Sequence, residues 1–206
     1  SNGAGPEHSN CLESLFMHAP GLTIVTPSCP YDAKGLLKAA IRSDNPVLFC
    51  EPKLLYQSKQ EIADDVYNSD YVIPLGLADV KREGTDVTLI AVGLMVPRAL
   101  AAAEELAKEG VSVEVIDPRT LAPLDKDTIY NSIRKTHRVA GVEESNKTAG
   151  IGAELAALFQ EELYDELDGP ITRIAALDVP VAYNIAMEHY SIPDADRICT
   201  AIRGML

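Results

Sequence analysis

His8 is the residue of this sequence whose type and setting best suit acid–base chemistry. It follows a turn that contains Gly3, Gly5 and Pro6, and it lies at the start of a predicted helix. Because the positive end of a helix dipole disfavours a protonated imidazole, a histidine there is suited to accept or donate a proton near neutral pH. An exposed N-terminal histidine without a function explains the same pattern, and the residues alone favour this simpler interpretation.

The other candidates for chemistry are weaker. His18, His137 and His189 lie beside the expected ends of helices and strands, where solvated or capping histidines are common. Ser28 lies in no G-x-S-x-G motif and has no base at a suitable spacing. The four cysteines are far apart and form no zinc motif, so we expect buried thiols in a reducing compartment.

Two further patterns have simple structural explanations. Residues 148–155 (TAGIGAEL) place two glycines before a predicted helix but lack the third glycine of a phosphate-binding turn. Close packing of a helix on a strand is the preferred explanation. The adjacent acids Glu143–Glu144 and Glu161–Glu162 could bind a metal or transfer protons, but neighbouring side chains point in different directions. A solvated face explains them better.

The composition excludes several classes of function. The chain has 206 residues, of which 47% are hydrophobic, so it can bury a substantial core. The 31 acidic residues outnumber the 18 basic ones, which argues against nucleic acid as a partner. No apolar run approaches the roughly 18 residues that a membrane span needs. The chain opens with Ser1 and Asn2 rather than methionine, which is typical of the remnant of a cleaved tag.

Hydrophobic spacing indicates an α/β fold. Runs rich in β-branched residues alternate with segments whose apolar side chains recur at helical spacing, an order that favours a mostly parallel sheet covered by helices. The predicted strands are residues 22–26, 46–50, 86–92, 111–116, 138–142 and 171–175. The predicted helices are residues 9–18, 31–42, 96–108, 125–135, 152–167 and 195–205.

Two local features refine this prediction. Residues 53–80 are polar and acidic without a sustained period, so we expect a linker between domains, with a short strand at residues 71–75. Oxygen-bearing side chains also suit the starts of three helices. The predicted N-caps are Asp125, Asp194, and either Asp32 or Ser28.

Four stretches of the chain resemble one protein family. They are GPEHSNCLESLFMHAPGL, VTPSCPYDAKGLLKAAIRSDNPVLF, EVIDPRTLAPLD and IPDADRI. Together they are similar to the beta subunits of thiamine-diphosphate-dependent 2-oxo acid dehydrogenases, along essentially the whole chain. The resemblance implies a three-layer α/β domain of the transketolase C-terminal type, preceded by the last part of a thiamine-diphosphate pyrimidine-binding domain. The implied divisions are residues 1–52 for the pyrimidine-binding part, 53–81 for the linker and 82–206 for the C-terminal domain.

The resemblance also implies site residues. His8, in the pattern G-x-x-H-S, matches the family histidine that assists proton transfer and substrate binding beside the thiazolium of thiamine diphosphate. The backbone carbonyls of Ala40, Ile41, Ser43 and Asn45 match ligands of a structural potassium ion. Many relatives have aspartate where this chain has Ser43, which leaves a backbone ligand intact. The family's cofactor-activating glutamate lies upstream of this chain, so we expect the chain alone to be inactive.

The implied activity is oxidative decarboxylation of pyruvate, followed by acyl transfer to lipoyl groups. The stretches KTHRVAGVEES and TAGIGAEL resemble pyruvate dehydrogenase more than the branched-chain enzyme. An acetoin or branched-chain 2-oxo acid dehydrogenase beta subunit is the alternative. Thiamine diphosphate binds together with an alpha subunit in the family, with Mg²⁺ on the alpha side. The implied compartment is the cytoplasm of a bacterium, or the mitochondrial matrix or plastid of a eukaryote.

The implied partners are an alpha subunit in an α2β2 assembly, a second beta subunit, and a lipoyl acyltransferase core whose small basic domain docks on the C-terminal domain. Residues 141–170 carry eight acids and one lysine and suit such a basic partner, although solubility alone also explains them. A different function is a non-catalytic module, in which residues 82–206 dimerise and dock partners without performing chemistry. Neither nucleic acid nor a membrane is expected as a partner.

Overall fold

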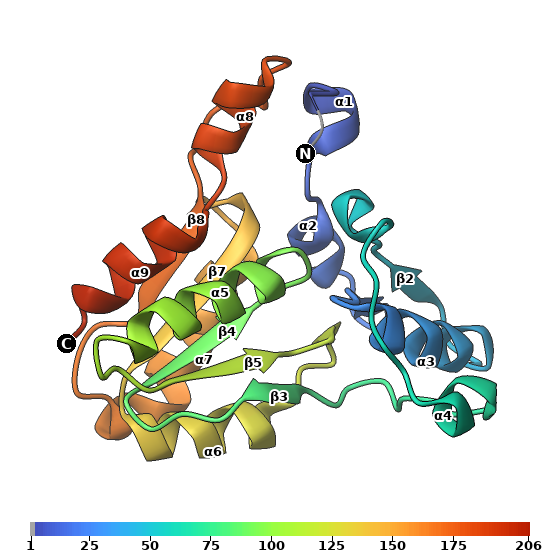
Figure 1. Cartoon of the computed structure of the whole chain (residues 1–206), viewed down its shortest axis with the longest axis horizontal. Helices are drawn as coiled ribbons and strands as arrows, with labels where there is room; N and C mark the ends of the chain where they lie inside the picture. Colours follow the sequence, from blue (N-terminus) through green and yellow to red (C-terminus); the bar gives the residue numbers. More distant parts are fainter. Residues whose placement is uncertain (1–2) are drawn as a thin grey trace.

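The structure, a computed structural model, describes residues 3–206; Ser1 and Asn2, the expected tag remnant, and the side chain of Asp65 lie outside the described part. Its larger sheet has five strands in the order β3–β5–β4–β7–β8 (Figure 1). Neighbouring strands pair in parallel except β3 and β5. The strands are β3 (Asp79–Arg82), β4 (Val87–Ala91), β5 (Val113–Asp117), β7 (Val139–Asn146) and β8 (Thr172–Ala176).

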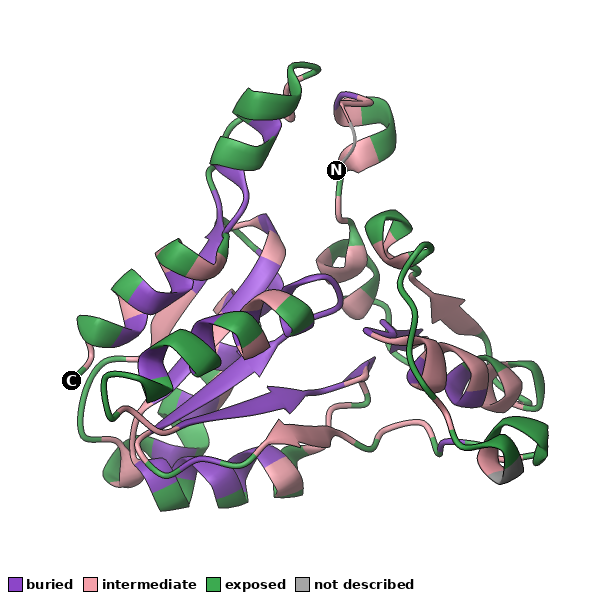
Figure 2. Ribbon diagram, in the orientation of Figure 1, coloured by how far each residue is buried: buried purple, intermediate pink, exposed green. Residues whose placement is uncertain are grey.

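Helices cover both faces of this sheet and make a three-layer domain. α5 (Met95–Ala107) and α9 (Ala195–Arg203) pack on one face, and α6 (Lys126–Thr136) and α7 (Ile151–Leu163) pack on the other. β4 and β5 are buried along their whole length (Figure 2), because helices cover both faces of the sheet at these strands. None of the helices in residues 3–206 is long and apolar enough to span a membrane.

A smaller sheet of three strands lies beside this domain, in the order β2–β1–β6. β1 (Thr23–Val25) pairs in parallel with β2 (Val47–Phe49) and antiparallel with β6 (Thr120–Ala122). α2 (Glu13–Met17) and α3 (Pro30–Ile41) flank it. β6 comes from the later part of the chain, and residues of β1 and β6 join the same hydrophobic cluster as α6 and α7. The two parts of the molecule therefore share a core.

The segment between the two parts, residues 53–78, contains the short helices η1 (Lys53–Leu55) and α4 (Asp64–Asn68). The strand predicted at residues 71–75 is wrong, because the chain there pairs with no strand of the described structure. Strand pairing begins only at β3, on the edge of the larger sheet.

The end of this segment packs on α3 instead. The Tyr71 ring stacks on Tyr31, with ring centroids 4.7 Å apart, and the Ile73 amide donates to the Gly35 carbonyl. A Cβ on Gly35 would lie 2.6 Å from the Ile73 side chain, so glycine lets the segment approach the helix closely. Side chains rather than a strand ladder fix this segment, and hydrophobic periodicity does not reveal such packing.

Two helices near the ends of the chain differ from the prediction. Residues 9–18 do not form one helix: α1 (Pro6–Ser9) ends at Asn10, whose backbone is extended, and α2 follows separately. α8 (Ile185–Ser191) is an additional helix. The Asn184 side chain caps it by accepting hydrogen bonds from two amides of its first turn.

The predicted N-caps are confirmed for two of the three helices. Asp125 and Asp194 each accept a hydrogen bond from a first-turn amide of the following helix, at 3.1 and 2.8 Å. At α3 the prediction is wrong, because the N-cap residue is Cys29 and no side chain caps the helix. Asp32 and Ser28 are used in a buried network instead.

Candidate functional site

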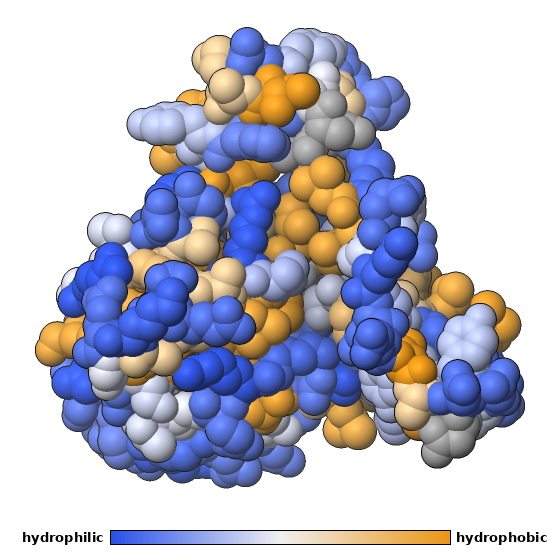
Figure 3. All heavy atoms as spheres, viewed as in Figure 1, coloured by the Kyte–Doolittle hydropathy of each residue, from blue (hydrophilic) through white to orange (hydrophobic). Residues whose placement is uncertain are grey.

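His8 stands at the mouth of a cleft between the two parts of the molecule. The cleft has a volume of about 280 Å³ and is bordered by α1, α2, the end of β2, the turn after β4 and the end of β7. Figure 3 shows hydrophobic atoms gathered in the hollow between α5 and the helices of the smaller sheet. His8 is exposed, so its imidazole is accessible to a substrate that enters the cleft.

His8 is held in place by hydrogen bonds to its backbone, and it does not lie at the start of a long helix. It is the third residue of α1, which has four residues, and the extended Asn10 separates it from α2. A macrodipole is the sum of many aligned peptides, and the single helix predicted over residues 9–18, on which the dipole argument for His8 rested, does not form. The His8 amide donates to the Gly5 carbonyl at 3.4 Å, and Lys53 Nζ donates to the His8 carbonyl.

Three polar atoms that line the cleft are buried without a hydrogen-bond partner among the described residues: Ser9 Oγ, Glu13 Oε2 and Thr26 Oγ1. Burial, together with the negative charges of Glu144 and Glu143, raises the pKa of Glu13. Unpartnered buried polar atoms are uncommon and cost free energy. These three atoms lie in one cleft beside His8, where they are available to form hydrogen bonds with a bound molecule.

The four cysteines are free thiols of low reactivity. Burial raises the pKa of Cys50 to about 11. Burial, reinforced by the Glu144 carboxylate, raises the pKa of Cys11 still further. A protonated thiol is a poor nucleophile. The prediction of buried thiols is correct for Cys199 only, because Cys11, Cys29 and Cys50 are half-buried.

Glu143 lines the cleft and is only 4% exposed. Its carboxylate accepts hydrogen bonds from the Ile151 amide at 2.7 Å and the Gly152 amide at 2.8 Å, and from the Ser145 hydroxyl. These amides open α7, so an internal carboxylate occupies the place that an anion takes at a helix N-terminus. A Cβ on Gly152 would lie 2.8 Å from this carboxylate. The two glycines of residues 148–155 therefore leave space for the Glu143 carboxylate, a contact that their sequence pattern does not reveal.

The two pairs of adjacent acids have different outcomes. The solvated face predicted for Glu143 is wrong, since the residue is buried and burial raises its pKa. Glu161 and Glu162 are exposed as predicted. The Glu162 carboxylate pairs with Lys126 at 2.7 Å, which lowers its pKa. Across residues 3–206, no group of three or more His, Cys, Asp or Glu side chains is arranged to bind a metal.

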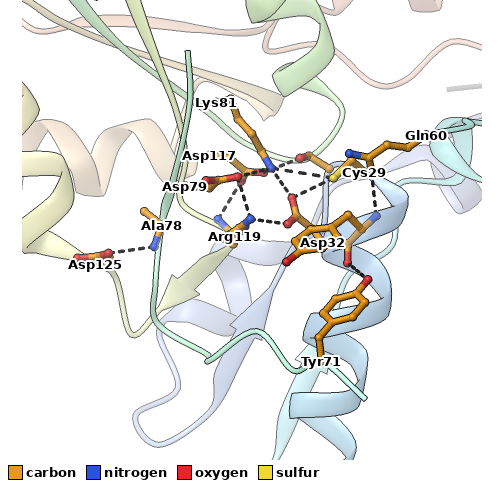
Figure 4. Close-up of polar contacts among 12 residues, drawn as sticks. Cys29, Asp32, Gln60, Tyr71, Ala78, Asp79, Lys81, Asp117, Arg119 and Asp125 are labelled. Carbon is orange, nitrogen blue, oxygen red and sulfur yellow. Dashed lines mark hydrogen bonds and ion pairs between the residues drawn. The ribbon is translucent and has the colours of Figure 1, made fainter. Parts of the chain in front are cut away.

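A buried ionic network joins the two parts of the molecule (Figure 4). Asp32 on α3 has no exposed side-chain surface and accepts from Lys81 Nζ at 2.5 Å and from Arg119 Nη2 at 2.6 Å. Asp79 binds the same two cations, at 2.7 and 2.8 Å. Burial raises the pKa of Asp32, but Lys81 and Arg119 outweigh burial and hold it below its ordinary value. The charged carboxylate therefore ties α3 to β3 and to the turn after β5.

Asp117, at the end of β5, is the second fully buried acid of this network. Its carboxylate accepts from Ser28 Oγ at 2.5 Å and from the Arg119 amide at 2.8 Å. Burial exceeds these contacts and raises the pKa of Asp117 to about 6. The network joins residues 25–49 to residues 114–125, two of the stretches that carry the family resemblance. No local pattern in the sequence connects these two stretches, so their pairing could not be predicted.

The four predicted potassium ligands lie at the end of α3 and in the turn that follows it. The Ala40 carbonyl accepts from the Ser43 amide at 3.2 Å, and the Asn45 carbonyl accepts from the Ser43 hydroxyl at 3.2 Å. The Ile41 side chain is 75% exposed. The Ala40 carbonyl also accepts from the Arg42 amide, which uses both of its lone pairs. The Asn45 carbonyl keeps acceptor capacity.

Two family models match the parts that border the cleft. The transketolase C-terminal domain matches residues 76–198, and the transketolase pyrimidine binding domain matches residues 2–59. The chain belongs to the transketolase family. His8 lies in the pyrimidine-binding match and Glu143 in the C-terminal match, so the cleft is bordered by both transketolase domains. The predicted fold class is confirmed.

Three curated relatives of the chain are beta subunits. The acetoin:2,6-dichlorophenolindophenol oxidoreductase subunit beta of Bacillus subtilis is 46% identical over 98% of this chain and 58% of its own length. The 2-oxoisovalerate dehydrogenase subunit beta of the same organism is 48% identical, over 96% of this chain and 60% of its own. The mitochondrial pyruvate dehydrogenase E1 component subunit beta-2 of Oryza sativa is 45% identical, over 98% and 54%. The predicted resemblance is confirmed.

A solved structure shows the same fold. The split gene transketolase described as an inactive beta4 tetramer matches with a TM-score of 0.78 and 25% identity, over 94% of this chain and 60% of its own. The chain thus spans 54–60% of the length of these transketolase-family proteins.

Proposed function

We propose that this chain is part of the beta subunit of a thiamine-diphosphate-dependent 2-oxo acid dehydrogenase that acts on pyruvate, with His8 as a catalytic residue. The position of His8 carries this proposal. Its imidazole stands where the pyrimidine-binding and C-terminal transketolase parts meet, beside a cleft with unpartnered buried polar atoms. The beta-subunit relatives found over nearly the whole chain support the same assignment.

The cleft fits the ring end of thiamine diphosphate better than its diphosphate end. The unpartnered atoms of Ser9, Glu13 and Thr26 suit the polar edge of a heterocycle. A diphosphate needs cations, yet carboxylates outnumber Lys53 among the charged lining groups. The lining carboxylates are Glu13, Glu51, Glu143 and Glu144. We therefore assign the diphosphate and its Mg²⁺ to the alpha subunit.

The role of His8 is proton transfer at the substrate. Bound thiamine diphosphate supplies the carbanion chemistry, and the imidazole of His8, exposed at the cleft mouth, is free to donate or accept a proton. Lys53 fixes the backbone of the loop at the His8 carbonyl. Proton transfer by His8 does not require a helix dipole, so this proposed role does not depend on α1 and α2 forming one helix.

The test uses the complete beta protein that contains this chain, co-expressed with an alpha subunit. In His8→Ala we expect kcat to fall by about 10²- to 10⁴-fold, the usual contribution of a general acid–base group. Electron transfer from 2-oxo acid to ferricyanide measures the rate. His18→Ala is the matched control, since His18 is exposed but does not line the cleft. A His8→Ala enzyme as active as the control would refute the assignment.

The choice of pyruvate rests on the sequence resemblance, because identities of 45%, 46% and 48% do not rank the relatives by substrate. A panel of pyruvate, 3-methyl-2-oxobutanoate and acetoin decides between them. We expect the highest kcat/KM with pyruvate. A preference for either other substrate selects the acetoin or branched-chain alternative.

We further propose three partners: the alpha subunit of an α2β2 assembly, a second beta subunit, and a lipoyl acyltransferase core. The exposed acids Glu161 and Glu162 on α7 suit a basic docking domain. Reversing both charges to lysine should weaken binding to the core in a pull-down at low salt, whereas Glu61→Lys in the linker should not. Unchanged binding would exclude this patch.

A non-catalytic dimerisation and docking module is the second candidate, favoured by the similarity to the split gene transketolase, an inactive beta4 tetramer. We propose that the 206-residue chain alone lacks activity. Turnover of any panel substrate by the isolated chain would contradict this. Light scattering on the same sample reports whether it associates.

The remaining assignments stay proposals of the same kind. We propose that the carbonyls of Ala40, Ile41, Ser43 and Asn45 hold K⁺, which predicts a melting temperature higher in KCl than in an equal concentration of NaCl. Equal melting temperatures would contradict the site.

We propose domain boundaries that divide the chain into residues 1–52, 53–81 and 82–206. Limited proteolysis should therefore cut the chain within the linker, residues 53–81. The compartment is the bacterial cytoplasm or, in a eukaryote, the mitochondrial matrix or plastid.

A further inference from the structure

A projecting arm of the C-terminal part, residues 177–191, holds the loop that carries His8. Figure 1 shows α8, in this arm, beside α1 at the top of the molecule and away from both sheets. Tyr183 Oη donates a hydrogen bond to Glu7 Oε2 at 2.6 Å, and the Gly3 amide donates to Glu188 Oε2 at 2.7 Å. These contacts join opposite ends of the described chain.

The loop also fits the arm sterically. A Cβ on Gly5 would lie 2.4 Å from the Tyr183 ring, and one on Gly3 would lie 2.8 Å from Ile185. Both glycines have positive φ, +69° and +74°, which other residues adopt only with strain. Two requirements therefore favour glycine at these positions: the positive φ of the turn and the close approach of the arm.

Glu188 is buried in the contact between the arm and the loop, and it accepts a hydrogen bond from the loop. Its side chain is fully buried, whereas Met187 and Tyr190 on the same helix are 64% and 78% exposed. Figure 3 shows hydrophobic and hydrophilic side chains mixed on this exposed arm. Glu188 Oε1 has no partner among the described residues. A buried carboxylate needs donors, and the Gly3 amide is the donor that the loop supplies.

We infer that Tyr183 and Glu188 are positioning residues for His8. They fix the loop at Glu7 and Gly3, and Glu7 directly precedes the imidazole-bearing residue. On its other side, His8 is fixed by Lys53 at its carbonyl. The C-terminal arm thereby sets the position of the catalytic imidazole. This inference rests on the proposed function, because it assigns the arm to the same site.

The test uses the complete beta protein with its alpha subunit. Tyr183→Phe keeps the ring against Gly5 and removes only the hydroxyl that binds Glu7. We expect kcat to fall by about 10-fold through misplacement of the imidazole, with KM changed by less than about twofold. Tyr190→Phe removes an exposed hydroxyl from the same arm and should leave both constants unchanged.

A second variant separates positioning from general destabilisation. If the arm acts through the imidazole, adding Tyr183→Phe to His8→Ala should cause no further loss of kcat. Independent, multiplicative losses would overturn the inference. So would a Tyr183→Phe enzyme with wild-type kcat, or one whose kcat matches that of Tyr190→Phe.

Hydrogen exchange distinguishes failure of this inference from failure of the proposed function. The amides of residues 3–8 should exchange about 10-fold faster in Tyr183→Phe than in Tyr190→Phe. If the wild-type enzyme processes no substrate of the panel, the proposed function fails, and the exchange result alone decides whether the arm holds the loop. Equal exchange in the two variants would overturn the inference whatever the activity.

Discussion

Asp32→Asn removes one negative charge from the buried network between the two parts, without changing the side-chain shape. In the wild-type protein the carboxylate neutralises Lys81 and Arg119, whose side chains are 14% and 11% exposed. Removing one partner of a buried pair costs about 3–5 kcal/mol. Asp79 still binds both cations but is itself 35% exposed, so we expect the lower end, about 3 kcal/mol.

Urea denaturation followed by circular dichroism measures this loss. With an m-value of about 2–3 kcal/mol per M, the midpoint should fall by about 1 M. Asp70→Asn is the matched control, because Asp70 also binds two cations, Lys38 on α3 and the C-cap residue Arg42, but is 69% exposed. Exposed pairs contribute little, so its midpoint should stay nearly unchanged. Equal midpoints for the two variants would refute the argument that burial gives this network its strength.

The pH dependence provides an independent check. The folded-state pKa of Asp32 is lowered from 3.8, so its contribution to stability is present above pH 3.8 and is lost as the pH falls through the folded-state value. The difference in unfolding free energy between wild type and Asp32→Asn should therefore shrink below pH 3.8. A constant difference across this range would mean that the carboxylate charge is not what stabilises the fold.

Two more predictions concern buried acids. Asp117 has its pKa raised from 3.8 to about 6, so its contribution to the free energy of unfolding is present below pH 3.8 and is lost as the pH rises through about 6. In Asp117→Asn this part of the pH dependence of unfolding should vanish. An unchanged pH dependence would contradict the prediction. Gly152→Ala forces a Cβ within 2.8 Å of the Glu143 carboxylate and should cost about 1–3 kcal/mol, whereas Gly169→Ala, with nothing within 4 Å, should be nearly neutral by urea denaturation.

The parts of the fold that the sequence predicted depend on short-range rules. Asp125 and Asp194 cap helices within three residues of themselves, and the interior strands β4 and β5 are rich in β-branched residues. β6 has only three residues, too few to show a period, and it forms by pairing with β1 from a distant part of the chain. The failed cap at α3 has the same origin, because Arg119 and Lys81 recruit Asp32.

The candidate site rests on His8, which remains a sequence-based prediction, and on surrounding contacts that the sequence did not predict. His8 was located through the G-x-x-H-S pattern, and the structure places it beside a cleft. The contacts that fix its loop come from Lys53 and from the C-terminal arm. They link residues that no local pattern connects, so neither α8 nor the burial of Glu188 could be inferred from spacing.

Two sets of contacts with different chemistry join the segments around the cleft, the ionic network of Asp32 and the hydrogen bond between Tyr183 and Glu7. They should have different effects when they are removed. The network around Asp32 is buried and ionic, so it should govern the stability of the joined parts. The contact of Tyr183 with Glu7 is exposed, and an exposed hydrogen bond contributes little to stability. Its effect should therefore appear in turnover rather than in the urea midpoint. A residue of each kind, Asp32 and Tyr183, thus allows the stability of the fold and the placement of His8 to be varied independently.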